Sequence, residues 1–271
     1  MLITENQLDE WVRGNARDAQ GVIVELIGRL VAASCPRPRE RRFQWEDSIG
    51  QHGPDGVLDT DLDFEPFVPK GKSFWEIGTG FRARDKATSD YKDLSKDVPK
   101  NIRHESTFIF ETPLSGQREW EYTWNKDAQA AWVENHRTKD EWKDVRIIDG
   151  TKLIDWLHQF PAVERWLARK MGLPVQQIDT AEERWEVLRT ISGPPLTPQV
   201  FLINREAACD KLKEIFAGSI GRLKLQTHFP DQIVDFIAAY LMTFDEETRA
   251  DVAGRCLVIS GIEAWNAICE Q

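Results

Sequence analysis

The chain has 271 residues, of which 41% are hydrophobic and 30% charged, a balance typical of a folded protein with one or two domains. Its net charge of −10 argues against a protein that coats nucleic acid over its whole surface, although a local basic groove can coexist with an acidic body. No stretch is long and apolar enough to cross a membrane. Because the cysteines are widely spaced and no signal-peptide pattern occurs, we expect a cytoplasmic protein without a disulfide framework or zinc site.

Helical and extended patterns alternate along the first two thirds of the chain. Apolar residues recur at helical spacing over 8–33, which predicts a long helix that Pro36 and Pro38 end. Strands are expected at 43–46, 56–60, 73–77, 107–112 and 145–150, and helices at 85–95, 125–142, 151–158, 161–171 and 181–191. This order predicts an α/β fold with a mixed central sheet flanked by helices.

A proline-rich segment, Gly193-Pro194-Pro195-Leu196-Thr197-Pro198, is the clearest boundary in the chain. We therefore expect a first domain over 1–191, a linker at 192–198 and a small α/β module over 199–271. Within that module the patterns predict helices at 204–216, 231–242 and 263–269, and strands at 223–226 and 255–260.

One acidic residue precedes the second predicted strand, and another lies on the third. Asp55 lies in a Gly-Pro-Asp-Gly turn, where its carboxylate can project freely, and Glu76 lies on the strand between Trp75 and Ile77. If the two apolar neighbours face the core, Glu76 faces the other way. Gly78 ends the strand and allows a phosphate to approach the backbone. Magnesium prefers oxygen ligands and needs few carboxylates, so this pair predicts a site for Mg²⁺ or Mn²⁺.

Two further motifs near this pair begin like known binding loops but depart from them. The acidic run from Asp59 to Glu65 begins like an EF-hand, but the expected glycine is Phe64, so we interpret it as a solvated loop. Gly71-Lys72-Ser73 resembles the end of a P-loop, but the required first glycine is Pro66 and a strand follows, so we reject a nucleotide-binding loop.

The order of these motifs resembles the PD-(D/E)XK, or restriction-endonuclease-like, nucleases. Pro54-Asp55-Gly56 matches the first acidic motif and Glu76-Ile77-Gly78 the second, while Glu25 matches an extra acidic residue on the first helix. Residues 145–153 look like the last core strand and helix of the type IV restriction-like branch, and the resemblance covers 7–166. It implies a metal-dependent endodeoxyribonuclease acting on double-stranded DNA, with Asp55 and Glu76 as metal ligands and Glu25 assisting.

The sequence departs from that family at the lysine two residues after the glutamate, a position that Gly78 occupies. Lys86 could supply the missing ammonium from the following helix. If it does not, the fold would be a catalytically weak or inactive module that binds nucleic acid or oligomerises. Basic residues after the strand are expected to hold the DNA backbone, and their alternative is a solvated surface; they are Arg82, Arg84, Lys92 and Lys96.

A narrower resemblance connects the chain to effector regions at the N-termini of bacterial antiviral STAND NTPases. It is carried by Trp75-Glu76-Ile77-Gly78-Thr79 with Lys86-Ala87 and Asp90-Tyr91, and by segments 235–241 and 255–259. It implies an effector in anti-phage defence that cleaves DNA with little sequence specificity and works as a homo-oligomer, a dimer or tetramer. No Walker A motif is present. A third interpretation is an oligomerisation scaffold built on tryptophan-rich helices and the C-terminal module. Each nuclease residue also has a structural alternative: a turn for Asp55, an exposed strand face for Glu76, the protein surface for Lys86 and an ion pair with Arg29 for Glu25.

Overall fold

The computed structural model describes residues 3–43, 53–115, 124–173, 178–191, 193–218, 221–229, 231–259 and 261–269. The chain forms two compact units, Met1–Leu173 and Pro174–Gln271. Among the described residues, no helix combines the length and the apolar character needed to cross a membrane.

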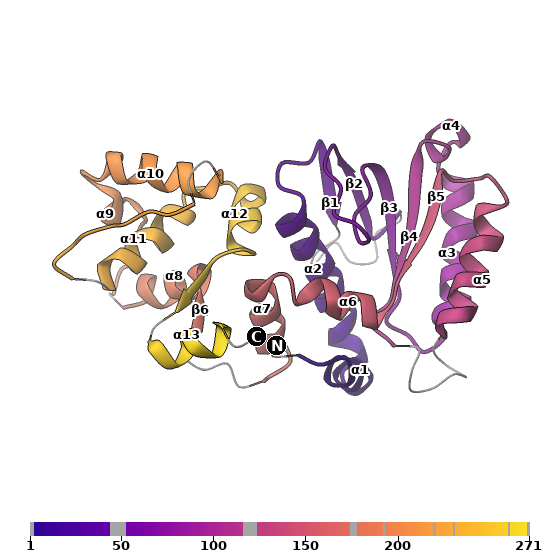
Figure 1. Cartoon of the computed structure of the whole chain (residues 1–271), viewed down its shortest axis with the longest axis horizontal. Coiled ribbons are helices and arrows are strands. Elements are labelled where there is room, and N and C mark those ends of the chain that lie inside the picture. The colour runs from indigo at the N-terminus through magenta and orange to yellow at the C-terminus, as the bar shows by residue number, and fades with distance from the viewer. Residues whose placement is uncertain are drawn as a thin grey trace. The chain divides into compact units, whose positions relative to one another are not determined.

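The first unit is organised around a five-stranded sheet with the order β1-β2-β3-β4-β5 (Figure 1). Its strands are β1 (Glu40–Phe43), β2 (Gly56–Thr60), β3 (Gly71–Ile77), β4 (Ser106–Glu111) and β5 (Asp144–Ile148). The pairs β1–β2 and β2–β3 are antiparallel, whereas β3–β4 and β4–β5 are parallel. The predicted α/β fold with a mixed central sheet is therefore confirmed. The carboxyl ends of β3, β4 and β5 meet at one edge of the sheet, where open α/β folds usually place their sites.

Helices cover both faces of this sheet, because side chains on successive strand residues point to opposite faces. On one face, Trp75 of β3 stacks with Trp156, their ring centroids 6.2 Å apart. On the other, Phe74 of β3 meets Trp142, and Phe108 of β4 meets Tyr91. The first face carries α1 (Glu5–Gly14), α2 (Ala16–Ser34), α6 (Gly150–Leu157) and α7 (Pro161–Lys170); the second carries α3 (Ala83–Asp97) and α5 (Lys126–Arg137), and the short α4 (Lys100–Arg103) leads into β4 (Figure 1).

Several predicted elements differ in their bounds. The long N-terminal helix is interrupted at Asn15, whose backbone and side-chain N–H groups both donate to the carbonyl of Trp11 and end α1. β1 precedes the strand predicted at 43–46, most of which lies outside the described residues. Asn125, the first residue of the helix predicted at 125–142, caps α5 by accepting from the Ala128 N–H at 2.8 Å, but that helix ends before 142.

The helix predicted at 151–158, for which Thr151 is the cap that the sequence suggests, is capped instead by Asp149. The Asp149 carboxylate accepts a hydrogen bond from the Lys152 N–H at 3.1 Å, and the helix begins at Gly150. An aspartate one residue after a strand satisfies a free N–H group of the first helical turn, as Thr151 would have done two residues later.

The second unit joins segments that the sequence had separated. β6 (Ile178–Thr180) pairs with β7 (Leu257–Ile259), and α8 (Ala181–Arg189) packs on α11 (Asp231–Leu241) through Trp185. Residues 178–191 therefore belong with the C-terminal unit, and the division between units precedes the linker expected at 192–198. The unit also contains α9 (Gln199–Leu202), α10 (Glu206–Phe216), α12 (Glu246–Ala253) and α13 (Ile262–Cys269). The strand predicted at 223–226 is wrong, since these residues form no regular element.

Candidate metal centre

Asp55 projects from the turn before β2 onto the end of β3. Its Oδ2 accepts a hydrogen bond from the backbone N–H of Ile77 at 2.8 Å. The following residue is a glycine, and a Cβ at Gly56 would displace the ring of Phe43 on the paired strand. The close pairing of Phe43 with Gly56 thus sets where the turn, and its carboxylate, emerges.

Glu76 lies on β3 on the same face as Phe74, with its side chain buried. Its carboxyl group lies close enough to that of Asp55 for each to affect the pKa of the other. Burial raises the pKa of Glu76 to about 9, and the neighbouring charges of Asp55 and Asp90 add to the shift. Burial also raises the pKa of Asp55, against the hydrogen bond from Ile77 and the charge of Lys86. Two buried carboxyl groups in contact share a proton at neutral pH unless a cation neutralises them.

Lys86 of α3 reaches the space that the missing lysine would use. A Cβ built on Gly78 would lie 3.3 Å from the Cγ of Lys86 and 2.7 Å from the ring of Phe110. The ammonium pairs with Asp90 at 2.5 Å, and its positive charge lowers the pKa of both Asp55 and Glu76. The structure therefore brings Asp55, Glu76 and Lys86 together.

Glu111, which the sequence analysis did not single out, ends β4 with its side chain on the sheet face of Trp75 and Ile77, opposite the face of Glu76. It pairs in register with Ile77, and its side chain is fully buried with no hydrogen-bond partner on either carboxyl oxygen. Burial raises the pKa of Glu111 well above its ordinary value, and the charges of Asp55 and Asp149 raise it further. The available signal was a glutamate as the last residue of an otherwise apolar strand pattern, at an edge where parallel strands end.

Two carboxylates can serve a hard cation here. Within the described ranges, no group of three or more His, Cys, Asp or Glu side chains is arranged to hold a metal ion. Magnesium retains several waters and is often bound through one or two carboxylates, so Asp55 and Glu76 are a sufficient donor set. The residues present fit Mg²⁺ or Mn²⁺.

Glu25 is placed elsewhere. It lies on α2, on the face of the sheet opposite α3, and forms an ion pair with Arg29 at 3.0 Å, with Lys170 of α7 3.9 Å away. The ion pair with Arg29 was the structural alternative for this residue, and it is present. The structure does not bring Glu25 together with Asp55 and Glu76.

The four basic residues proposed for DNA binding all lie on or next to α3 and are exposed. They do not form one surface. At 100° per residue, Arg82 lies on the side of α3 that carries Lys86, whereas Arg84 lies on the opposite side. Lys96 pairs with Asp93 at 2.8 Å, and residues 82–97 contain five basic and four acidic side chains. Among the basic side chains of α3, it is the charge of Lys86 that acts on both carboxyl groups.

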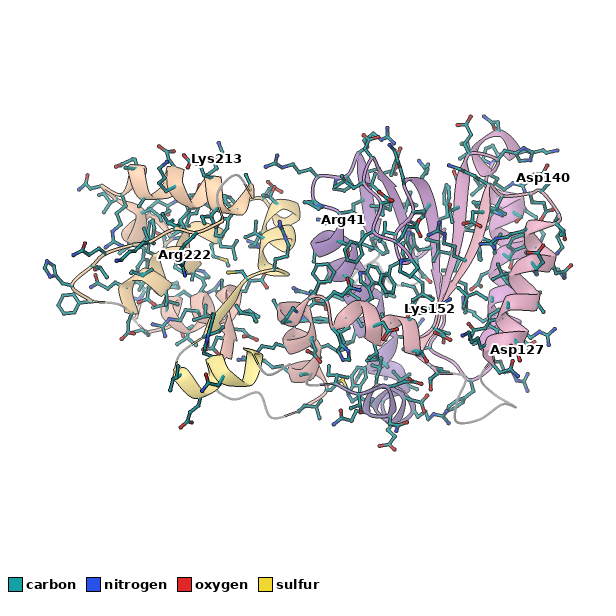
Figure 2. All side chains as sticks on the ribbon, viewed as in Figure 1. Arg41, Asp127, Asp140, Lys152, Lys213 and Arg222 are labelled. Carbon is teal, nitrogen blue, oxygen red and sulfur yellow. The ribbon has the colours of Figure 1, made fainter. Side chains whose placement is uncertain are left out.

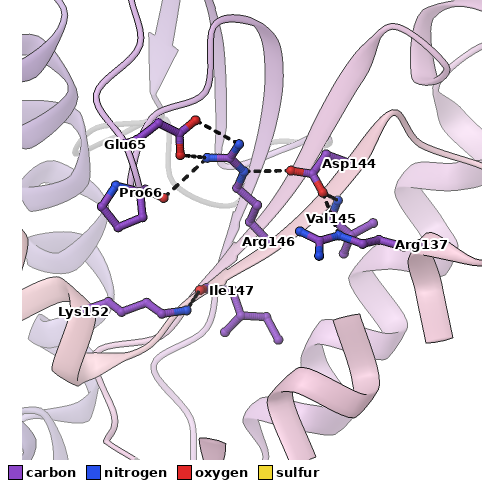
Figure 3. A network of polar contacts seen from close by, with 8 residues as sticks. All are labelled: Glu65, Pro66, Arg137, Asp144, Val145, Arg146, Ile147 and Lys152. Atoms are coloured by element: carbon purple, nitrogen blue, oxygen red, sulfur yellow. Dashed lines mark hydrogen bonds and ion pairs between the residues drawn. The ribbon is translucent and has the colours of Figure 1, made fainter. Parts of the chain in front are cut away.

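A groove of about 1230 Å³ lies along β5, between α5 and α6. Figure 3 shows that its charged side chains pair with one another: Arg146 joins Glu65 to Asp144, which also binds Arg137. Lys152, which Figure 2 places beside the sheet, donates to the carbonyl of Ile147 at 2.7 Å. Asp144 likewise accepts from the N–H of Val145 at 2.8 Å. These side chains satisfy backbone groups of β5 on the side away from β4.

Three comparisons, with models of protein families, with curated proteins and with solved structures, give no match for this chain.

Proposed function

We propose that the first unit is a Mg²⁺-dependent DNA endonuclease of the PD-(D/E)XK type. The observation that carries the proposal is the convergence of Asp55, Glu76 and Lys86, with the Lys86 side chain passing through the space beside Gly78. In the family, the lysine follows the glutamate on the same strand. Here the carboxylates come from a turn (Asp55) and a strand (Glu76), and the ammonium comes from a helix (Lys86).

Each side chain has a distinct role in this reaction. Asp55 and Glu76 hold Mg²⁺ or Mn²⁺, which when bound lowers the pKa of a water and neutralises charge on the phosphate. Lys86, released from Asp90, orients the attacking water or stabilises the negative charge of the pentacovalent phosphate. The backbone at Gly78 leaves room for the phosphate.

The substrate that we infer is double-stranded DNA, cleaved with little sequence specificity. Contacts from Arg82 and its neighbours Arg84, Lys92 and Lys96 would go to phosphates, so binding should weaken as salt rises. The resemblance to STAND effector regions supports a role in anti-phage defence in the cytoplasm. It also supports activation by homo-oligomerisation, because a permanently active nuclease would damage the host.

Plasmid cleavage tests the proposal directly. Wild-type protein and the variants Asp55→Ala, Glu76→Ala and Lys86→Ala are incubated with supercoiled plasmid and Mg²⁺, each as the isolated chain and fused to a dimer-forming coiled coil. We expect cleavage by the wild type, strongest in the fused dimer, and its loss in the variants. No cleavage by the wild-type dimer would refute the nuclease, and cleavage unchanged in the Asp55 and Glu76 variants would refute the site.

A second candidate is a module that binds nucleic acid without cutting it. The ion pair between Lys86 and Asp90 favours it, because an ammonium held by a carboxylate is less available to a water or phosphate. The same experiment separates the two: a mobility shift with intact DNA, unchanged by Asp55→Ala, is the result expected of a binding module.

A further inference from the structure

Phe81 is an exposed aromatic residue in the loop that joins β3 to α3. Among the residues of the first unit that the structure describes, it is the only phenylalanine, tryptophan or tyrosine in an exposed position, at 44% exposure. A single exposed apolar residue needs no explanation in itself. The position of this one sets it apart, because it lies between Glu76 on β3 and Lys86 on α3. Three residues of chain place its Cα within about 11 Å of the Cα of Gly78.

The Phe81 ring is held by side chains of α1. The buried Asp9 forms an ion pair with Arg13 at 2.8 Å. The guanidinium of Arg13 in turn lies over the Phe81 ring, with its Cζ 5.2 Å from the ring centroid. A cation over an aromatic face attracts the ring. These contacts restrict where the exposed ring can lie, and such preorganisation lowers the entropy cost of binding a ligand to it.

The residue after Phe81 is Arg82, which is exposed and whose charge the proposed function assigns to a DNA phosphate. Proteins that hold a nucleic-acid strand without reading its sequence combine basic groups, which follow the phosphates, with aromatic side chains on which bases stack. Phe81 and Arg82 supply one of each on the same loop. Stacking tolerates any base, because every base has a π face, and so it suits a nuclease with little sequence specificity.

We propose that Phe81 stacks on a base next to the scissile phosphate, so that DNA is cut preferentially where a base is unpaired. This inference rests on the proposed function, which places that phosphate at Asp55 and Glu76. Successive bases of a strand lie about 3.4 Å apart, so the reach of the loop spans about three of them. A base in an intact duplex must leave the stack to meet the ring, and leaving it costs least for a mismatched or single-stranded base.

DNA binding without cleavage tests the contact itself. Fluorescence anisotropy in EDTA measures the affinity of the full chain for a single-stranded oligonucleotide and for a strand of equal length that carries no bases. The variants are Phe81→Ala, which removes the ring, and Phe81→Trp, which keeps an aromatic face. Phe229→Ala is the matched control, since it removes an exposed phenylalanine of the second unit. Thermal unfolding verifies that every variant is folded.

We expect Phe81→Ala to weaken binding of the strand with bases about 5-fold to 100-fold, while Phe81→Trp and Phe229→Ala bind like the wild type. The strand without bases should bind equally to the wild type and to Phe81→Ala. An unchanged affinity in Phe81→Ala, an equal loss on both strands, or a wild type that binds neither strand would overturn the stacking contact.

Cleavage by the fused dimer in Mg²⁺ then tests the preference. Two duplexes of one sequence are compared, one fully paired and one with a single unpaired base. The wild type should cut the second at least about 5-fold faster, and Phe81→Ala should cut both at similar rates. Equal wild-type rates would overturn the preference and leave the nuclease standing. If Phe81 contributes to binding but the wild type cuts neither duplex, the stacking contact stands, and the cleavage preference and the proposed nuclease both fail.

Discussion

Lys86 and Gly78 occupy neighbouring space: the Cγ of Lys86 lies 3.3 Å from the point where residue 78 would carry a Cβ. The side chain of Lys86, from the helix after β3, fills part of the space that a side chain at position 78 would occupy. Phe110 closes the same space from β4 at 2.7 Å. Glycine at 78 is thus required by the packing of Lys86 and Phe110 as well as by the approach of a substrate.

Gly78→Ala should destabilise the first unit. The new methyl group would lie closer to the Phe110 ring than side-chain carbons normally come, and overpacking of this kind costs about 1–3 kcal/mol. Gly80→Ala is the control, because a Cβ there meets nothing within 4 Å. Urea unfolding of both variants compares the two costs, and equal stabilities would show that the Phe110 ring moves aside freely.

Lys86→Met should abolish DNA cleavage while leaving the fold intact. The side chain is 48% exposed and its ion pair with Asp90 contributes little to stability, whereas a positioned proton-transfer or charge-stabilising group contributes about 10²–10⁴-fold to rate. Lys70→Met, an exposed lysine before the opposite end of β3, serves as the control. Single-turnover cleavage rates of the fused dimers measure the effect. If Lys86→Met cleaves DNA at a rate within about threefold of the control, the loss is smaller than such a group produces, and the catalytic role of Lys86 is contradicted.

Glu76→Gln should stabilise the metal-free protein at neutral pH. The pKa of Glu76 is raised to about 9 by burial and by Asp55, so the folded protein holds a proton that the unfolded chain releases above its ordinary pKa. The resulting penalty is absent below about pH 4 and grows as pH rises toward 9. Unfolding in EDTA at pH 4 and pH 8 measures it: the gain from Glu76→Gln should appear only at pH 8. A gain of the same size at both values would point to packing instead.

Asp144→Asn should weaken the first unit at neutral pH and lose that effect in acid. Burial alone would raise the pKa of Asp144, but hydrogen bonding to Arg146 and the charge of Arg137 outweigh it and lower that pKa. The stabilisation is therefore present above the ordinary pKa of about 3.9 and disappears as pH falls through the lower value in the folded protein. Since the group is partly exposed, we expect about 1 kcal/mol at pH 7 from urea unfolding. A deficit that persists at pH 2.5 would mean that the charge is not its source.

Local patterns predicted the elements that position the candidate site, and long-range pairing decided the rest. The turn at Asp55 and the strand through Glu76 are encoded by glycines and by alternating side chains, so their contact could be expected from the sequence. The ion pair of Glu25 with Arg29 could also be expected from their helical spacing, but the position of Glu25 away from Asp55 could not, because it depends on which side of α2 faces α7. Glu111 was missed for a related reason: burial of a strand's last residue depends on that strand becoming central.

The division between the units shows the same limit. The proline-rich segment at 193–198 is a true local signal of irregular backbone, but the pairing of β6 with β7 joins residues far apart in the chain. No window of neighbouring residues contains that information. The strand predicted at 223–226 is wrong for the converse reason. Its residues alternate as in a strand, but among the described residues no strand pairs with them.

The edge strand β5 has a consequence for assembly. The Val145 N–H and the Ile147 carbonyl, which point away from β4, are already bound by Asp144 and Lys152. An incoming strand would have to displace both side chains, and break the Arg146 network, before it could pair with β5. The sheet is thereby protected from extension into β-aggregates along this edge. We therefore expect any dimer or tetramer of this protein to associate without joining the central sheets of its copies through β5.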